Sequence, residues 1–178
     1  MTITSIAVFC GSKPGNKNIY LEHTNRLGTL LAEKKIEIIY GGGNKGLMGA
    51  VANAAMQHLG RVTGIIPKFL SAQEHQHEGL HELHVVETMH IRKQMLYEKC
   101  QAAIILPGGY GTLDEVFEIL TWNQLSLHEK KIFILNSGGF YDHLLAHIHQ
   151  MQEEGFLYSK ADETLTVLAT PDELLLHI

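Results

Sequence analysis

The sequence has little cysteine, little proline, and no long run of apolar residues. Its 178 residues include two cysteines, four prolines and one tryptophan. The isolated thiols Cys10 and Cys100 give no disulfide framework, and the segment Met-Thr-Ile-Thr-Ser lacks the basic residues of a secretory signal. We therefore expect a reducing, cytoplasmic location. No apolar stretch is long enough to span a bilayer, so we expect no membrane association.

The sequence also lacks a concentrated positive charge. Its formal net charge is −5, and no long basic run is present. Proteins that bind nucleic acids or membrane surfaces generally carry a cationic surface, so the composition argues against both classes of partner. A hydrophobic content of 45% is ample for a core. With no internal repeat and no linker, the chain is predicted to be one domain over residues 1–178.

Short apolar runs alternate with segments that have helical periodicity. Strands are expected over residues 3–10, 36–40, 61–66, 83–87, 102–106, 131–135 and 164–168. Helices are expected over residues 18–35, 47–59, 89–100 and 140–153, with another from Thr112 and a short one from Pro171. The polar segment 68–80 is expected to be a loop or a frayed helix. Because most strands are apolar on both faces, the pattern predicts a doubly wound α/β fold with a mostly parallel sheet, a Rossmann-like three-layer α/β/α arrangement.

The turn after the fifth expected strand has the features of an anion site. An apolar strand ends at Pro107, glycines follow in Gly108-Gly109-Tyr110-Gly111-Thr112, and a helix is expected to begin near Thr112. The amides at a helix N-terminus point outward, and the helix dipole favours negative charge there. We expect this turn to bind a phosphate. Glycine-bearing turns also follow the first and second strands, and all three belong at the edge where such sheets bind ligands.

The second glycine turn, Gly41-x-Gly43-x-x-Gly46, matches the dinucleotide fingerprint only in part. The fingerprint requires an acid at the end of the next strand, where this chain has Ile65-Ile66-Pro67-Lys68. A redox enzyme with an NAD site is therefore disfavoured. A Walker A loop is excluded because no Gly-Lys-Ser/Thr follows the glycines.

Glu115 has two possible roles. In the first, Thr112-Leu113-Asp114-Glu115 forms a capping box in which Thr112 and Glu115 satisfy each other's backbone donors. In the second, a carboxylate beside a phosphate site stabilises positive charge at a sugar carbon or activates water. Sequence spacing alone leaves both roles open.

Arg92 and Lys93 precede an apolar helical pattern, and the histidines are scattered. The cationic pair is either a solvated surface pair or a clamp on a phosphate or a sugar hydroxyl. Histidines gather near one polar loop and on one later helix, but no spacing matches a known metal motif. We expect surface histidines and no metal; the residues concerned are His75, His77, His81, His84, His143 and His147.

Several of these motifs together resemble the Lonely Guy (LOG) family of cytokinin riboside 5′-monophosphate phosphoribohydrolases, many of which were once labelled lysine decarboxylases. The resemblance covers nearly the whole chain. The residues that carry it are Pro107-Gly108-Gly109-Tyr110-Gly111-Thr112-x-x-Glu115, Met89-His90-x-Arg92-Lys93, Gly41-Gly42-Gly43-x-x-Gly46-Leu47-Met48-Gly49 and Thr121-Trp122-x-Gln124-Leu125.

The resemblance implies a Rossmann-like homodimer that cleaves the N-glycosidic bond of a nucleoside 5′-monophosphate, such as AMP or a cytokinin riboside monophosphate, to the free base and ribose 5-phosphate. Arg92 and Glu115 correspond to the catalytic pair. Substrate contacts correspond to Glu74, Arg92, Lys93, Gly108, Gly109, Tyr110, Gly111, Thr112, Leu113, Asp114, Glu115 and Thr121. The chain departs from the family at Asp114, where Glu is frequent, and at Asn44-Lys45 inside the second glycine turn.

Three functions remain to be compared. The first is a hydrolase that needs no metal or redox cofactor, with the 5′-phosphate on the amides of Gly109, Gly111 and Thr112. The second is a module that senses a nucleotide without cleaving it. The third is an NAD-dependent oxidoreductase, which the missing acid disfavours. The old decarboxylase label fails on chemistry, because no lysine with a partner for a pyridinium nitrogen can be nominated.

Overall fold

The computed structural model describes residues 3–71 and 76–178. Its strands are β1 (Ser5–Phe9), β2 (Glu37–Tyr40), β3 (Val62–Pro67), β4 (Glu82–Val86), β5 (Ala102–Ile105), β6 (Lys131–Leu135) and β7 (Leu165–Leu168). Its α-helices are α1 (Asn18–Glu33), α2 (Gly46–Gln57), α3 (Lys68–Ser71), α4 (Met89–Lys99), α5 (Tyr110–Gln124), α6 (Asp142–Glu153) and α7 (Ala161–Thr164). Two 3₁₀ helices are η1 (Ser137–Gly139) and η2 (Pro171–Leu176).

The strands of the described residues form one seven-stranded sheet in the order β4-β3-β2-β1-β5-β6-β7. Every pair of neighbouring strands is parallel. The strand order reverses between β1 and β5, which pair with Ile6 opposite Ala102 and Phe9 opposite Ile105. Ligands of such sheets bind beyond the carboxyl ends of the strands at this reversal. The predicted fold class is confirmed.

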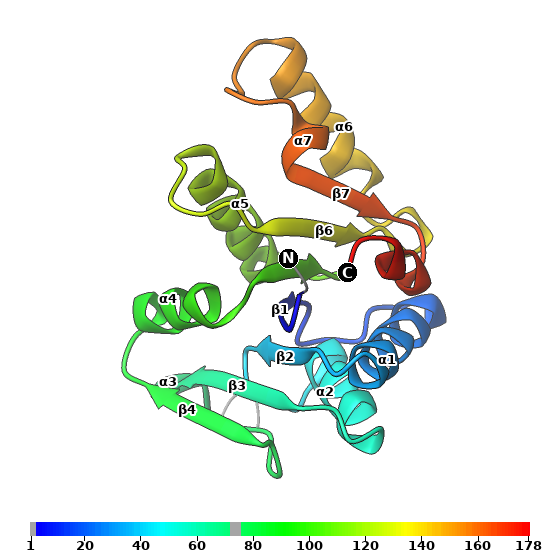
Figure 1. Cartoon of the computed structure of the whole chain (residues 1–178), viewed down its shortest axis with the longest axis vertical. Coiled ribbons are helices and arrows are strands. Elements are labelled where there is room, and N and C mark those ends of the chain that lie inside the picture. The colour runs from blue at the N-terminus through cyan, green and yellow to red at the C-terminus, as the bar shows by residue number, and fades with distance from the viewer. Residues whose placement is uncertain (1–2, 72–75) are drawn as a thin grey trace.

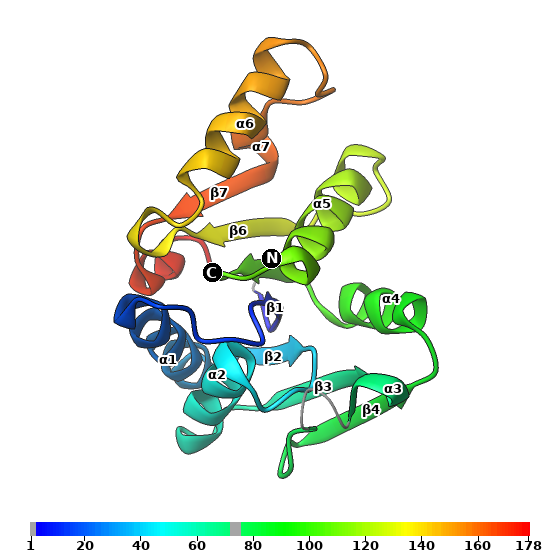
Figure 2. The same ribbon diagram turned by 180° about the vertical axis from the view of Figure 1, so that it is seen from behind.

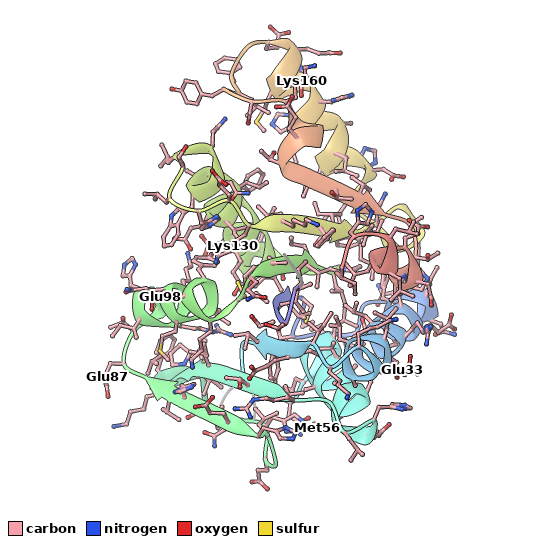
Figure 3. All side chains as sticks on the ribbon, in the orientation of Figure 1. Glu33, Met56, Glu87, Glu98, Lys130 and Lys160 are labelled. Atoms are coloured by element: carbon pink, nitrogen blue, oxygen red, sulfur yellow. The ribbon has the colours of Figure 1, made fainter. Side chains whose placement is uncertain are left out.

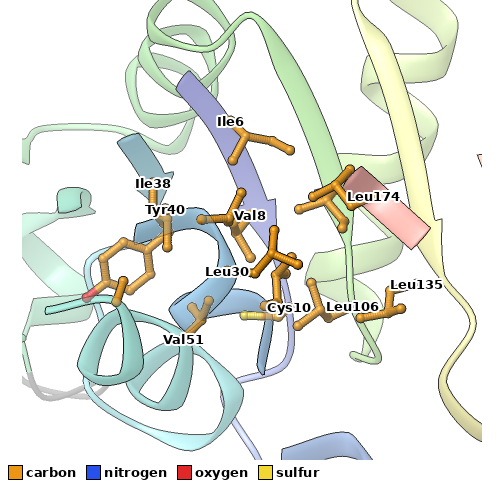
Figure 4. Close-up of a cluster of buried hydrophobic side chains, with 14 of the residues drawn as sticks. Ile6, Val8, Cys10, Leu30, Ile38, Tyr40, Val51, Leu106, Leu135 and Leu174 are labelled. Carbon is orange, nitrogen blue, oxygen red and sulfur yellow. The ribbon is translucent and has the colours of Figure 1, made fainter. Parts of the chain in front are cut away.

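Helices cover both faces of the sheet (Figures 1 and 2). Helices α1 and α2, with η2, pack on one face, where Val8 of β1 lies in a cluster with Leu30 and Val51 (Figure 4). Helices α4, α5 and α6 pack on the other face, where Phe9 meets Tyr97 with ring centroids 6.0 Å apart. Alternate residues of a strand point to opposite faces, so the continuous apolar run of β1 serves both cores.

Charged side chains such as Glu33, Glu87 and Lys160 lie at the periphery of the molecule (Figure 3). In the described part of the chain, none of the helices combines the length and the apolar character needed to cross a membrane.

The structure differs from the sequence predictions at two helix starts. Helix α5 begins at Tyr110 rather than near Thr112, and the helix expected from residue 140 begins at Asp142, after η1. Segment 68–80 contains the short helix α3, and Gln76 forms an isolated antiparallel bridge with Gly43. These features depend on contacts with the glycine turns, which local periodicity does not encode.

Candidate active site

A cavity of about 370 Å³ lies beyond the carboxyl ends of β1 and β2, beside the reversal of strand order. It is lined by Val8, Cys10, Ser12, Gly41, Met48, Met89, Arg92, Gly109, Tyr110, Gly111, Thr112, Asp114 and Glu115. The cavity therefore joins the ends of β1 and β2 to the starts of α2, α4 and α5. The sequence patterns predict that the glycine-bearing turns among these segments lie at one edge of the sheet. In the structure these segments line one cavity.

The turn at residues 108–112, which was predicted to bind a phosphate, leaves the start of α5 open. Gly109 is the N-cap residue of α5, and no side chain caps it by a hydrogen bond. The first intrahelical bond of this turn runs from the amide of Leu113 to the carbonyl of Gly109, over 3.1 Å. The preceding amides of Tyr110, Gly111 and Thr112 thus belong to the helix positions that lack an intrahelical acceptor. An anion in the cavity can accept hydrogen bonds from them and is favoured by the helix dipole.

Position 108 has no room for a side chain, because Thr112 lies close to the Gly108 backbone. A Cβ atom at Gly108 would lie 2.1 Å from Oγ1 of Thr112, which is buried against the turn. This contact tightens the turn so that the backbone of the following residues faces the cavity.

The capping-box interpretation of Glu115 is wrong. That motif needs Thr112 as the N-cap, whereas the N-cap is Gly109 and Thr112 lies inside the first turn of α5. Glu115 lies one turn further along α5, half-buried, and lines the same cavity as Arg92. The capping-box role of Glu115 is thereby excluded.

Arg92 is fixed in place by backbone carbonyls. Its side chain is buried, with Nε donating to the carbonyl of Ile65 over 3.1 Å and Nη2 donating to the carbonyl of Gly41 over 3.1 Å. Helix α4 positions the residue, and the Thr88 side chain caps that helix by accepting from the amide of Ile91 over 3.2 Å. Hydrogen bonds to a charged group each contribute about 1.5–3 kcal/mol, so the guanidinium plane is held in one orientation.

Position 41 requires glycine, because the Arg92 guanidinium occupies the space that a Cβ atom would fill. A Cβ atom at Gly41 would lie 2.0 Å from Nη2 of Arg92 and 3.2 Å from its Cζ. The second glycine turn thus supports the arginine, a role that the dinucleotide fingerprint does not include.

Lys93 points away from its neighbour Arg92 and toward α5. Its Nζ lies 2.7 Å from Oδ2 of Asp114 and 3.3 Å from Oε2 of Glu118. Although burial alone lowers the pKa of Lys93, its hydrogen bonds to Asp114 and Glu118 raise that pKa above the ordinary value. Lys93 is therefore a fully charged partner of two carboxylates at neutral pH.

The structure does not bring every predicted site residue to the cavity. Thr121 is exposed on α5, donates from Oγ1 to the carbonyl of Phe117 over 2.6 Å, and lines a separate groove of about 230 Å³. Leu113 packs against the core under α5, and Gly108 lines a neighbouring cavity of about 240 Å³. Glu74 lies outside the described residues.

Cavity residues that were not predicted as substrate contacts are mainly apolar. They are Val8, Cys10, Met48 and Met89, together with Ser12. They lie at the end of β1 or just after it, or at the start of α2 or α4, and this position is the signal that could have found them. Methionines can adapt their shape to a ligand and form an apolar wall beside the polar groups.

Within residues 3–71 and 76–178, no cluster of three or more His, Cys, Asp or Glu side chains is arranged to hold a metal ion. The expectation of surface histidines is wrong for His77, which is buried and contacts the Asn53 side chain, with Nε2 3.1 Å from Oδ1. His75 is outside the described residues.

Fold and cavity together define a Rossmann-like α/β protein with a cavity beside the reversal of its sheet, lined by the start of α5. The family model described as "Possible lysine decarboxylase" matches residues 48–178. A cytokinin riboside 5′-monophosphate phosphoribohydrolase of Arabidopsis thaliana is 42% identical over 170 residues, which cover 96% of this chain and 80% of that protein. One from Rhodococcoides fascians is 45% identical over 157 residues, covering 88% and 79%. The chain belongs to this family, the LOG family.

Among solved structures, the molybdenum cofactor binding protein of Rippkaea orientalis is similar, with a TM-score of 0.72 and 22% identity. The match covers 98% of this chain and 94% of that protein. At this identity the likeness concerns the fold.

Proposed function

We propose that this chain hydrolyses the N-glycosidic bond of a nucleoside 5′-monophosphate and releases the free base and ribose 5-phosphate. The observation that carries the proposal is the shared cavity of Arg92, Glu115 and the open N-terminus of α5. Its relatives named as phosphoribohydrolases match over most of the chain, which supports the same reaction.

The substrate's phosphate binds at the amides of Gly109, Gly111 and Thr112. A dianion there gains charge-assisted hydrogen bonds and the favourable end of the α5 dipole. The cavity volume of about 370 Å³ falls within the range of small-molecule sites, about 300–1,000 Å³, and suits a nucleotide rather than a larger ligand. Tyr110 and Asp114, which also line the cavity, contact the substrate at its rim.

Glu115 acts on the sugar. As the bond between C1′ and the base nitrogen breaks, its electron pair leaves with the base and positive charge develops at C1′. The carboxylate of Glu115 stabilises that charge and aligns the attacking water. Water supplies the hydroxyl at C1′ and the proton that the base acquires. Arg92, held by Gly41 and Ile65, orients the sugar phosphate.

The two names carried by similar proteins imply different chemistry. A lysine decarboxylase built on pyridoxal phosphate needs a lysine for the Schiff base and a partner for the pyridinium nitrogen. The cavity lining among the described residues contains no lysine. The cavity instead offers a carboxylate and a guanidinium, the groups that glycoside cleavage uses.

The chain forms a homodimer through the outward face of α5. Phe117 is 39% exposed there and Tyr110 is 94% exposed. A groove of about 230 Å³ with an apolar lining from Phe117, Leu120 and Ile148 continues this face. A second copy covers such a surface, since apolar patches exposed to water are uncommon in monomers. Thr121, which lines the groove, is then available to a substrate at the dimer interface.

The protein works in the cytoplasm on small molecules and not on nucleic acids. Support comes from the buried Cys10 and Cys100, which are not joined in a disulfide, and from the net charge of −5.

The test is chromatographic detection of free base from AMP and from isopentenyl-AMP. Glu115→Gln is expected to lose at least about 100-fold in kcat with unchanged folding. Glu98→Gln makes the same change on the exposed side of α4 and is expected to retain wild-type kcat. A protein that binds AMP tightly in calorimetry and leaves it intact would instead be a nucleotide sensor.

A further inference from the structure

Two helices that carry the proposed catalytic pair are joined by a line of polar contacts. Arg92 and Lys93 are consecutive on α4, and Asp114 and Glu115 are consecutive on α5. Consecutive helix residues point in different directions. Arg92 and Glu115 line the cavity, whereas Lys93 pairs with Asp114 and Glu118.

The contacts between the helices follow helical spacing on both sides. Lys93 and Tyr97 are four residues apart on α4, and Asp114 and Glu118 are four residues apart on α5. The Tyr97 hydroxyl donates to Oε2 of Glu118 over 2.7 Å. Residues at this spacing share a helix face, so two pairs of side chains meet across the helix contact.

Buried aromatic side chains add a further contact between α4 and α5. Tyr97 is 2% exposed, and its ring meets Trp122 edge to face with centroids 4.9 Å apart. Trp122 follows Glu118 by one helical turn. The line from Lys93 to Trp122 therefore fixes both the separation and the rotation of α4 against α5.

Charge argues against Lys93 as a phosphate ligand. Asp114 and Glu118 would repel each other at this spacing, and Lys93 compensates them. Two carboxylates to one ammonium leave the cluster with a net negative charge, which disfavours a dianion beside it. Of the described residues, Arg92 and Asp114 line the cavity and Lys93 does not.

We propose that Lys93 is a positioning residue, which with Glu118 and Tyr97 holds α4 on α5 and so sets Arg92 opposite Glu115, and that it does not bind the substrate's phosphate. The proposal rests on the function proposed above for the reaction. It assigns Lys93 a role different from the substrate contact that the family resemblance implies.

The most discriminating variant is Glu118→Gln. Glu118 is outside the cavity lining, and glutamine retains an acceptor for the Tyr97 hydroxyl. A positioning role predicts that kcat for AMP falls about 10- to 100-fold, as misplacement of catalytic groups by about 1 Å does, while KM changes little. If Lys93 bound phosphate, freeing it from a carboxylate would leave kcat intact and lower KM.

Lys93→Met tests the same proposal by changing the lysine of the Lys93–Glu118 pair instead of the carboxylate. It removes the charge and keeps much of the length of the side chain. A positioning role predicts a similar fall in kcat, with the affinity for ribose 5-phosphate in calorimetry changed by less than about threefold. Loss of that affinity by tenfold or more would overturn the proposal. Lys93→Arg, which can still pair with Asp114 and Glu118, is expected to restore most of kcat.

A double variant adds an internal control. If Lys93 and Glu118 act through one contact, Lys93→Met with Glu118→Gln has the kcat of either single variant; multiplied losses contradict the proposal. Circular dichroism and thermal melting check that each variant folds. Should the wild type release no base from any nucleotide, the proposed reaction fails. The ribose 5-phosphate comparison still decides whether Lys93 binds the phosphate.

Discussion

Gly41→Ala is predicted to disable the site by displacing Arg92, although neither proposed catalytic residue is itself substituted. The new Cβ would lie 2.0 Å from Nη2 of Arg92, where carbon and nitrogen atoms need about 3.5 Å. The guanidinium must therefore move by about 1.5 Å. Its hydrogen bond to the carbonyl of Gly41, now 3.1 Å long, is then broken or bent.

The size of the effect follows from this displacement. Losing one hydrogen bond to a charged group costs about 1.5–3 kcal/mol, and displacing a catalytic group by about 1 Å lowers the rate about 100-fold. We expect kcat/KM for AMP to fall about 100-fold, with a loss of unfolding free energy of no more than about 3 kcal/mol. The other close neighbour of the new methyl group is the flexible Met48 side chain, with Sδ at 3.2 Å, so the fold should survive.

The assay is a double-mutant cycle in which free base is measured by chromatography. In an Arg92→Ala background the clash is absent, so adding Gly41→Ala should change neither kcat/KM nor the melting temperature further. Wild-type kcat/KM in the Gly41→Ala single variant would refute the reasoning, because it would mean that Arg92 can do its work from another position.

Two further predictions concern pH and assembly. Burial raises the pKa of the Cys100 thiol from 9.0 to about 11, so the unfolded thiol ionises at lower pH than the folded one. The free energy of unfolding should fall as pH rises from 9 to 11, by up to about 1.4 kcal/mol per pH unit, and urea denaturation of Cys100→Ala should show a shallower fall. An equal fall in both proteins would mean that other groups dominate. Phe117→Glu places a charge on the outward face of α5 and should shift the molecular mass in light scattering from dimer to monomer; an unchanged dimer would place the interface elsewhere.

Much of the fold could be predicted because the strands are marked locally. The apolar runs around Val8 and Ile104 are buried on both faces, and such runs indicate parallel strands between helices. Pro107 and the glycines after it mark the end of β5. Each of these signals depends on a few neighbouring residues, so the strands and their ends can be predicted from a single sequence.

The site was predictable only in part, because its geometry depends on long-range contacts. The spacing of Thr112 and Glu115 fits a capping box, yet the tight contact between Thr112 and Gly108 moves the helix start to Tyr110. The support of Arg92 by Gly41 joins residues 51 positions apart and has no local pattern. The partners of Lys93, Asp114 and Glu118, lie on another helix, so the sequence of the Arg92-Lys93 pair does not show where the Lys93 side chain points.

The most direct test of the account compares AMP with adenosine as substrates of the wild-type protein. If the amides at the start of α5 bind the phosphate, AMP should yield adenine and ribose 5-phosphate in equal amounts. The kcat/KM for adenosine should then be at least about 100-fold lower, the equivalent of one or two charge-assisted hydrogen bonds. Equal rates for the two substrates, or AMP left intact, would contradict the central claim.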